Sequence, residues 1–268
     1  MRLTALIFSL CIVSGCASTR KLHGDKKTFA PNPVIAHRGA FKKNGFPENS
    51  IAALKEAIRL QCTGSEFDVR MTADDSLIVN HDPHYAKLEI GKTTFAELRR
   101  IPLSNGELLP TLREYLLAGL DNNTQTRLVL EIKPAATKER GLEIVSQVVA
   151  LVKSLSAEPM IVYISFDYDM VKKLVSLSRH VPVQYLNGDR SPAQLAKDGI
   201  SGADYHFTVF KKNTAWIREA RENNIRLNAW TVNDTTTMNW LLAEKFDFIT
   251  TNEPELLLMR LERSTIAD

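Results

Sequence analysis

Residues 128–155, LVLEIKPAATKERGLEIVSQVVALVKSL, contain the strand-then-helix unit that decides the fold. The apolar run 128–132 is typical of a short buried strand, and residues 139–155 carry apolar side chains at helical spacing. Similar units occur on both sides of this stretch. Alternating strands and helices favour a parallel sheet with the helices packed outside it.

Strand and helix segments pair off from residue 33 onward. We expect the pairs at 34–36 and 51–60, 65–71 and 112–120, 128–132 and 139–155, 161–166 and 169–177, 183–186 and 192–197, 203–207 and 214–223, 226–231 and 236–242, and 246–249 and 254–263. A short insert follows the second strand, with an apolar run at 77–79 and a helical segment at 95–100. Eight pairs in about 230 residues predict a closed α/β barrel of the TIM (βα)8 type. An open doubly wound sheet is the alternative, but no glycine-rich dinucleotide turn follows the first strand.

Composition narrows the class of protein. The chain has 268 residues, 44% hydrophobic and 24% charged, which is ordinary for a globular protein. The formal net charge of +3 is too small to indicate a nucleic-acid partner. No feature of the sequence points to an obligate protein partner.

The first residues predict a secretory signal. Arg2 precedes an apolar run at 3–13, which ends in Ser14-Gly15-Cys16. The run is shorter than the roughly 20 apolar residues that cross a membrane. Residues 13–16 also resemble the lipobox of bacterial lipoproteins, in which the peptide is cut before the cysteine and the cysteine is lipidated. A plain signal peptide with an incidental cysteine is the alternative.

The lipobox resemblance implies three parts of the chain. These are a signal peptide at 1–15, the lipidated Cys16 with a polar tether at 16–32, and the barrel domain at 33–268. It implies a protein anchored by lipid in the bacterial cell envelope. Ala17 stands where an aspartate would resemble an inner-membrane retention signal, so the outer membrane is favoured over the inner membrane. Only Cys62 remains in the mature chain besides Cys16, so we expect no disulfide within it.

Carboxylates gather where the predicted strands end, which is where a TIM barrel carries its active site. Glu66 and Asp68 lie two residues apart on the second strand and therefore on one face. Glu131 lies on the third strand. A low-dielectric mouth does not tolerate three ionised carboxylates without compensation, and Mg²⁺ and Ca²⁺ both prefer oxygen ligands. The cluster predicts a site for one divalent cation; a solvated strand face or an ion pair is the alternative for Glu66 and Asp68.

Two histidines at neighbouring segment ends are candidates for acid–base chemistry. His37 follows the first strand and His81 follows the run at 77–79. Cleavage of a phosphodiester needs one group to take a proton from the nucleophile and another to give one to the leaving oxygen. Either histidine alone would more often be a structural residue.

Cationic and aromatic side chains complete the predicted mouth. Arg38 and Lys133 are candidates for binding phosphate oxygens, by a guanidinium fork and a point charge respectively. A salt bridge with a neighbouring glutamate is the alternative for Lys133. Trp230 is expected to wall the substrate pocket and to stack on a choline-like group; simple barrel packing is its alternative.

The motifs at these positions resemble the glycerophosphodiester phosphodiesterase family. The matching segments are VIAHRGAFKKNGFPENSIAALKEAI at 34–58, EFDVRMTADDSLIVNHDP at 66–83, GELLPTLREYLLAG at 106–119, LVLEIKP at 128–134, ISFDYDMV at 164–171 and AWTVN at 229–233. They stand in the family's order and cover the chain from about residue 33 to 262. Asn252 departs from the pattern, because it stands where the family usually has an aspartate.

The resemblance implies a TIM barrel of the phospholipase C-like phosphodiesterase type. It implies one Mg²⁺ or Ca²⁺ on Glu66, Asp68 and Glu131, with His37 and His81 as general acid and base. The expected reaction releases sn-glycerol 3-phosphate and an alcohol from a small glycerophosphodiester. Water attacks phosphorus directly, or a glycerol hydroxyl attacks first and forms a cyclic phosphate. The alternatives are a phospholipase-like enzyme acting on lysolipids or phosphoinositides, and a catalytically silent surface binding protein.

Overall fold

Eight parallel strands close into a barrel in the computed structural model, which describes residues 29–266 and, for 263–266, the backbone alone. The strands follow each other around the barrel in the order β1 (Val34–Ala36), β2 (Gly64–Met71), β6 (Arg127–Ile132), β7 (Ile161–Ser165), β8 (Val183–Tyr185), β9 (Gly202–His206), β10 (Arg226–Trp230) and β11 (Phe248–Thr251). Closure comes from the β1–β2 pairing, in which Ile35 lies opposite Gly64. The predicted TIM barrel is confirmed. The signal peptide, Cys16 and residues 17–28 lie outside the described residues.

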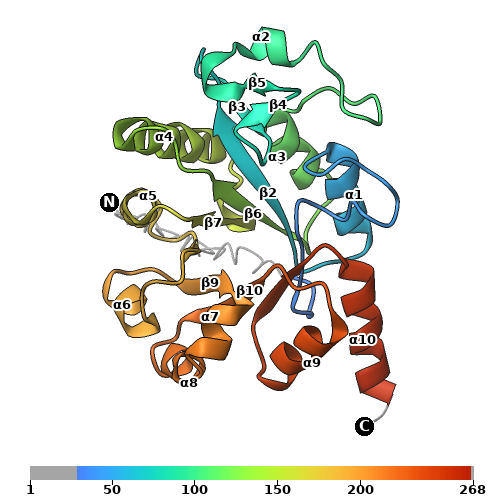
Figure 1. The fold of residues 1–268 in the computed structure, drawn as a ribbon, viewed down its shortest axis with the longest axis vertical. Coiled ribbons are helices and arrows are strands. Elements are labelled where there is room, and N and C mark those ends of the chain that lie inside the picture. The colour runs from blue at the N-terminus through green and yellow to red at the C-terminus, as the bar shows by residue number, and fades with distance from the viewer. Residues whose placement is uncertain (1–28, 267–268) are drawn as a thin grey trace, which may run out of the picture.

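Helices surround the barrel, as Figure 1 shows. They are α1 (Ile51–Arg59), α3 (Leu112–Leu120), α4 (Lys138–Ser154), α5 (Tyr168–Leu177), α6 (Pro192–Lys197), α7 (Phe207–Lys212), α8 (Ala215–Glu222), α9 (Thr235–Ala243) and α10 (Pro254–Ile266), with a short 3-10 helix, η2 (Glu158–Met160), before β7. Side-chain caps begin several of them. Thr111 and Glu114 form a reciprocal capping box at the start of α3. Within the described residues, no helix is both long enough and apolar enough to cross a membrane.

Two apolar cores hold the barrel together. The larger one lies between the sheet and the helices and includes Phe67, Val69 and the free cysteine Cys62. A smaller one fills the barrel interior with side chains from β1, β6, β7 and the loop after β8: Ile35, Val129, Val162, Ile164 and Leu186. Ile164 and Leu186 of this core also form part of the wall of the cavity described below.

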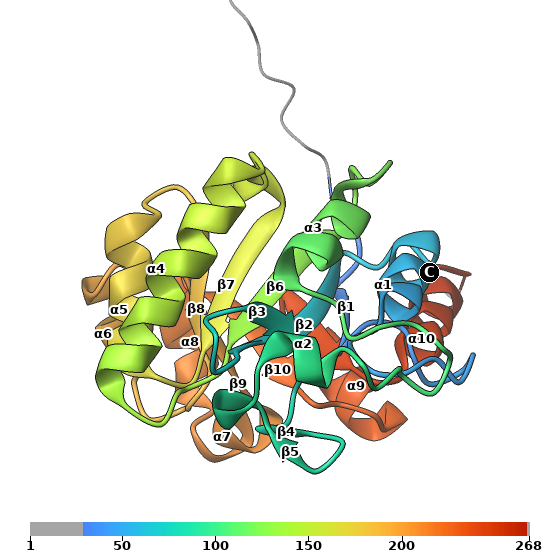
Figure 2. The ribbon, with the colours of Figure 1, turned by 90° about the horizontal axis from the view of Figure 1, so that it is seen from above.

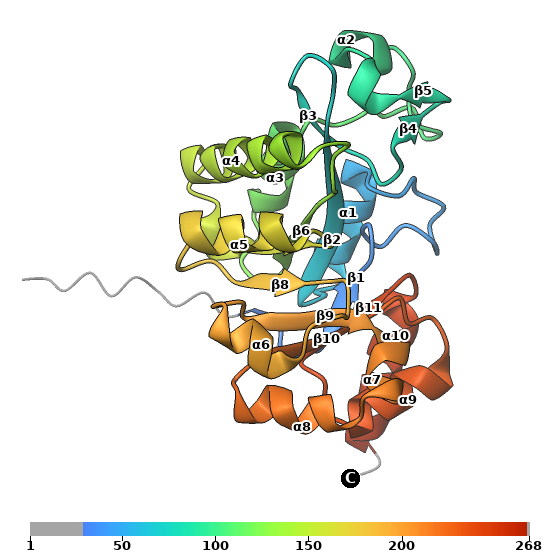
Figure 3. The same ribbon diagram turned by 60° about the vertical axis from the view of Figure 1, so that its left-hand side comes forward.

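The insert after β2 forms a small separate lobe. It contains β3 (Leu77–Val79), β4 (His84–Tyr85), β5 (Leu88–Glu89), a 3-10 helix η1 (Ile90–Lys92) and α2 (Phe95–Leu98). Figure 3 shows this lobe projecting beyond the ring of helices, and Figure 2 shows β4 and β5 on the same side of the barrel as α7. Four of its buried side chains form their own cluster: Ile78, Ile90, Leu98 and Leu109. The lobe therefore stands beside the carboxyl ends of the strands.

The structure differs from the sequence-based expectation in three places. The run 77–79 is strand β3, antiparallel to β2 and outside the barrel as part of the insert, and the hairpin of β4 and β5 that follows it was not expected. Residues 207–212 form α7, an additional helix where we expected a connection. The last strand spans residues 248–251 instead of 246–249, because Phe246 packs into the outer core and Thr250 and Thr251 continue the strand beside β1.

Candidate active site

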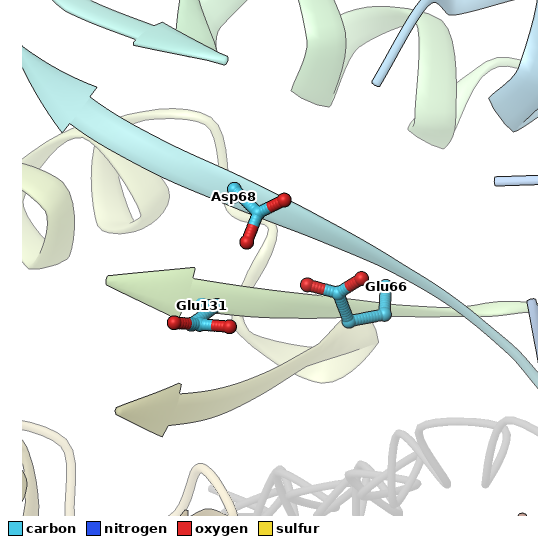
Figure 4. A group of neighbouring side chains, drawn as sticks. All are labelled: Glu66, Asp68 and Glu131. Atoms are coloured by element: carbon cyan, nitrogen blue, oxygen red, sulfur yellow. The ribbon is translucent and has the colours of Figure 1, made fainter. Parts of the chain in front are cut away.

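Three carboxylates meet inside the mouth of the barrel. Glu66 and Asp68 lie on β2, and Glu131 lies on β6, where it is the direct neighbour of Asp68 in the sheet register. One oxygen from each lies within 4.8 Å of the others, and all three side chains are buried. Figure 4 shows the carboxylates turned toward one another from the two strands. The period of two along β2 places Glu66 and Asp68 on this inner face.

Lys133 neutralises part of this cluster. Its ammonium lies 2.9 Å from Oδ1 of Asp68 and 2.8 Å from Oε1 of Glu131. Burial opposes ionisation of Asp68, but Lys133 and Asn49 outweigh it and lower the pKa of Asp68. Burial, and then the charge of Asp68, raise the pKa of Glu131 to about 7 and raise that of Glu66 well above its usual range. One ammonium is therefore too little positive charge for three carboxylates.

Asn49 is a member of the site whose contact with Asp68 sequence reasoning missed. Its Nδ2 donates to Oδ2 of Asp68 at 2.8 Å, and its Oδ1 accepts from the backbone N–H of Asp68 at 3.1 Å. Its backbone φ is +60°, a conformation that asparagine tolerates better than most residues. Pro47-Glu48-Asn49 belongs to the family-like segment at 34–58, but nothing in that segment indicates a contact between Asn49 and Asp68.

The loop after β1 presents Arg38 to the cluster. Arg38 has a φ of +54°, and its backbone N–H donates to Oε2 of Glu66 at 2.9 Å. The next residue, Gly39, has a φ of +81°, and a Cβ there would come within 2.7 Å of Ala53 in α1. The guanidinium of Arg38 bonds to Glu48, and its buried Nε has no hydrogen-bond partner. That Nε lies 3.7 Å from Oδ2 of Asp68, and Arg38 lines the cavity described below.

His37 is held in one orientation by Asn252. The Nδ1–H of His37 donates to Oδ1 of Asn252 at 2.6 Å, because a carbonyl oxygen only accepts. The Nε2 atom then carries the lone pair and lies 3.9 Å from Oε2 of Glu66. Burial, and then the charge of Arg38, lower the pKa of His37 to about 4. His37 is therefore a neutral proton acceptor at neutral pH.

His81 reaches the mouth from the insert. Strand β3 runs back along β2, and the backbone N–H of Asn80 donates to the carbonyl of Asp68. His81 follows with its Nδ1 2.7 Å from Oδ1 of Asp82. Burial lowers its pKa, although nearby Asp68 favours the charged form. This imidazole lies at hydrogen-bond distance from a carboxylate, which stabilises its protonated form.

A cavity joins these groups. Thirteen residues line it, among them His37, Arg38, Glu66, His81, Glu131 and Lys133. Its other wall is largely apolar and includes Ile164, Phe166, Leu186 and Trp230. The Trp230 ring packs edge-to-face on Phe166 at 5.5 Å, and its Nε1–H donates to the carbonyl of Asp204 at 2.9 Å. Trp230 therefore both lines the cavity and packs within the barrel.

Asp204 is a second member of the cavity lining that sequence reasoning missed. It points inward from β9, it is 1% exposed, and its Oδ1 has no hydrogen-bond partner. Burial, and then the charge of Glu131, raise its pKa well above the usual range. Asp204 is a single acidic residue in a weakly predicted strand, and no motif around it indicates that it lines the cavity.

The acidic cluster fits a divalent cation by its chemistry. Its donor set is all oxygen, which suits Mg²⁺ or Ca²⁺. Oε1 of Glu66 is buried without a hydrogen-bond partner, although buried polar atoms normally have one. The pKa of Glu66 is raised by burial and because the buried carboxylates outnumber the positive charges beside them, and a bound cation would supply the missing charge.

The fold and the site together define a phosphodiesterase of the TIM-barrel class, with carboxylates, imidazoles and cations at one mouth. Comparison with known proteins makes this specific. The model of the glycerophosphoryl diester phosphodiesterase family matches residues 37–256. The chain belongs to this family and is an enzyme, a phosphoric diester hydrolase.

Relatives of known fold and name agree with the assignment. A crystal structure of a glycerophosphodiester phosphodiesterase from Parabacteroides distasonis is 37% identical and has a TM-score of 0.84, covering 90% of this chain and all of that one. A glycerophosphodiester phosphodiesterase from Caldanaerobacter subterraneus is 27% identical over 84% of this chain and 96% of its own length. A phosphodiesterase from Oleispira antarctica, solved with the product sn-glycerol-3-phosphate, is 21% identical with a TM-score of 0.74 over 86% of this chain and 97% of that one, and shows the fold alone.

Proposed function

We propose that the protein hydrolyses small glycerophosphodiesters to sn-glycerol 3-phosphate and an alcohol, with one Mg²⁺ or Ca²⁺ on Glu66, Asp68 and Glu131. The observation that carries the proposal is the single cavity lined by two imidazoles, two cations and two of these three carboxylates. The sn-glycerol-3-phosphate bound to the Oleispira antarctica enzyme supports the product.

The phosphate binds between the cationic side chains. Lys133 lies at the cluster and faces the cavity, and Arg38, whose Nε lies 3.7 Å from Oδ2 of Asp68, lines the same cavity. A guanidinium and an ammonium stabilise the negative charge that builds on the phosphoryl oxygens as the bond to the leaving group breaks. A bound divalent cation would add Lewis-acid stabilisation of the same charge.

The two histidines divide the proton transfers. His37 is neutral with its Nε2 lone pair free, so it takes the proton from the attacking oxygen, whether that oxygen belongs to water or to the glycerol hydroxyl. His81 gives a proton to the departing alcohol oxygen, and Asp82 stabilises the imidazolium that this role requires. The P–O bond to the alcohol breaks as that proton arrives.

Release of glycerol 3-phosphate from a panel of diesters tests the proposal. The protein is treated with a chelator and then assayed with Mg²⁺, with Ca²⁺ and without either. We expect turnover of glycerophosphocholine and glycerophosphoethanolamine, loss of turnover in the chelated protein and recovery with the cation. Full activity in the chelated protein contradicts the metal role, and faster cleavage of lysophosphatidylcholine contradicts the preference for small diesters.

The same proposal includes an envelope location through a lipid on Cys16. The lipobox-like residues 13–16 support it. Mass spectrometry of the mature protein is expected to show an acylated N-terminal cysteine, and Cys16→Ser is expected to release the protein from the membrane fraction. An unmodified mature chain that begins elsewhere contradicts the anchor.

A further inference from the structure

A second cleft opens beside the catalytic cavity, between the insert and the start of α4. It has a volume of about 450 Å³ and is lined by residues from β2, the insert, the loop after β6 and α4. Lys133 lines both this cleft and the catalytic cavity. The cleft is therefore adjacent to the cationic side chain that the proposed mechanism places at the phosphate.

Arg70 is the feature of the cleft that the mechanism does not use. It lies two residues beyond Asp68 on β2, so it shares the inner face with Glu66 and Asp68. Its Nε–H donates to the backbone carbonyl of His81 at 2.8 Å. Throughout residues 29–262, no carboxylate oxygen comes within 4.0 Å of its guanidinium. Within the same residues no hydrogen bond from its two terminal nitrogens is found, so both can donate to a ligand.

The other cations of the cleft already have partners. Lys92 lies 2.9 Å from Glu89, and Arg140 lies 2.6 Å from Asp75 and 2.8 Å from Glu143. Lys133 is held by the acidic cluster. Arg70 is thus the cation of this cleft with no acidic partner among the described residues, although it is half-buried.

The position of Arg70 also indicates which part of a substrate it would bind. It holds the backbone of His81, and His81 is the proton donor to the leaving alcohol in the proposed mechanism. Lys133 lines both cavities, so we place the leaving alcohol in the cleft of Arg70 and the glycerol part against the apolar wall around Trp230. A guanidinium with two free terminal nitrogens matches a carboxylate or a phosphate through paired hydrogen bonds.

We propose that this cleft is the subsite for the alcohol part of the diester and that Arg70 selects alcohols carrying an anionic group, with a carboxylate as its ligand. The inference rests on the proposed function, since it assigns the head group of the same reaction. It predicts a preference for glycerophosphoserine over glycerophosphoethanolamine. These two diesters differ only by the carboxylate.

The test compares kcat/KM for these two diesters in the wild type, Arg70→Gln and Arg70→Lys. We expect the wild type to prefer glycerophosphoserine by about tenfold, the value of one charge-assisted hydrogen-bond pair. Arg70→Gln is expected to abolish this preference, mainly by raising KM for glycerophosphoserine. Arg70→Lys is expected to retain part of it. Arg113→Gln, on the exposed face of α3, is the matched control and is expected to keep the wild-type ratio.

The ratio of kcat/KM for glycerophosphoserine to kcat/KM for glycerophosphoethanolamine distinguishes the possible outcomes. Arg70→Gln lowering both rates equally means that Arg70 only supports His81, and it overturns the subsite. A wild type without preference for glycerophosphoserine overturns it as well. A wild type that releases no glycerol 3-phosphate from either diester instead contradicts the proposed function itself.

Discussion

The side chain of Asn49 holds Asp68 through two hydrogen bonds, one to its carboxylate at 2.8 Å and one from its backbone N–H at 3.1 Å. The pair fixes both the rotamer of Asp68 and the distance between the loop after β1 and strand β2. One oxygen of Asp68 is thereby occupied, and the other faces Lys133 and the neighbouring carboxylates. The amide thus orients a proposed metal ligand without being one.

Replacing Asn49 by Ala is expected to weaken cation binding by about 10- to 100-fold, the usual effect of removing a group that orients a ligand. Isothermal titration of the chelated protein with Mg²⁺ or Ca²⁺ measures this. The exposed Asn122 also has a positive φ, of +50°, so Asn122→Ala carries the same backbone strain away from the site. Equal cation affinity in Asn49→Ala and Asn122→Ala would show that Asp68 needs no such support.

Replacing Glu66 by Gln is expected to stabilise the cation-free protein and to remove turnover. Burial and the neighbouring carboxylates raise the pKa of Glu66, so at pH values above its unfolded-state pKa this carboxyl destabilises the folded, cation-free protein. Gln removes this cost, and we expect Tm in the presence of a chelator to rise by roughly 2–4 °C. Added Mg²⁺ is expected to raise Tm in the wild type only. A variant that still gains stability from Mg²⁺ argues against Glu66 as a ligand.

Replacing Asn252 by Asp is expected to shift the acidic limb of the pH–rate profile upward. A carboxylate at this position stabilises protonated His37 and raises its pKa above the present value of about 4. The neutral, proton-accepting form is lost as pH falls through that pKa, so activity fails at a higher pH, by roughly 1–2 pH units. Profiles of kcat/KM for the wild type, Asn252→Asp and the exposed control Asn122→Asp measure the shift. If the acidic limb of the pH–rate profile is unchanged in Asn252→Asp, the protonation of His37 does not determine that limb.

Replacing Asp204 by Asn is expected to stabilise the protein increasingly as pH rises. The folded-state pKa of Asp204 is raised, so above the unfolded value of about 3.9 the folded state retains a proton that the unfolded state has lost. Stability therefore falls as pH rises between these two pKa values, and Asn removes that fall. Urea unfolding at pH 5 and pH 8, with a chelator present, measures it. Asp121→Asn on the surface is the control, and an equal effect from both variants rules out a special role for burial.

The barrel and the positions of the carboxylates could be predicted from the sequence, because both follow from simple periodic patterns of side chains. Eight strand–helix pairs specify a parallel sheet, and a spacing of two along β2 places Glu66 and Asp68 on one face. The register of β2 and β6 then brings Glu131 beside Asp68. These features depend on local pattern and on the known geometry of parallel strands.

The remaining features depend on contacts that no local pattern encodes. An apolar run such as 77–79 looks the same whichever way the strand runs, so the reversal of β3 that delivers His81 was not predictable from it. Asn49 and Asp68 are nineteen residues apart and meet only through the folded loop. Asp204 stands in a short strand with no neighbouring motif, and its burial becomes visible only once the barrel closes.

The chain enters the barrel at the end opposite the catalytic mouth. The backbone N–H of Ala30 donates to the backbone carbonyl of Gln125, just before β6. The side-chain amide of Asn32 donates to the backbone carbonyl of Gln61, just before β2. With the proposed lipid on Cys16, the stretch from Cys16 to Phe29 reaches at most about 45 Å. A tether of that length joins the barrel on the side away from the cavity, so it leaves the catalytic mouth open to substrate.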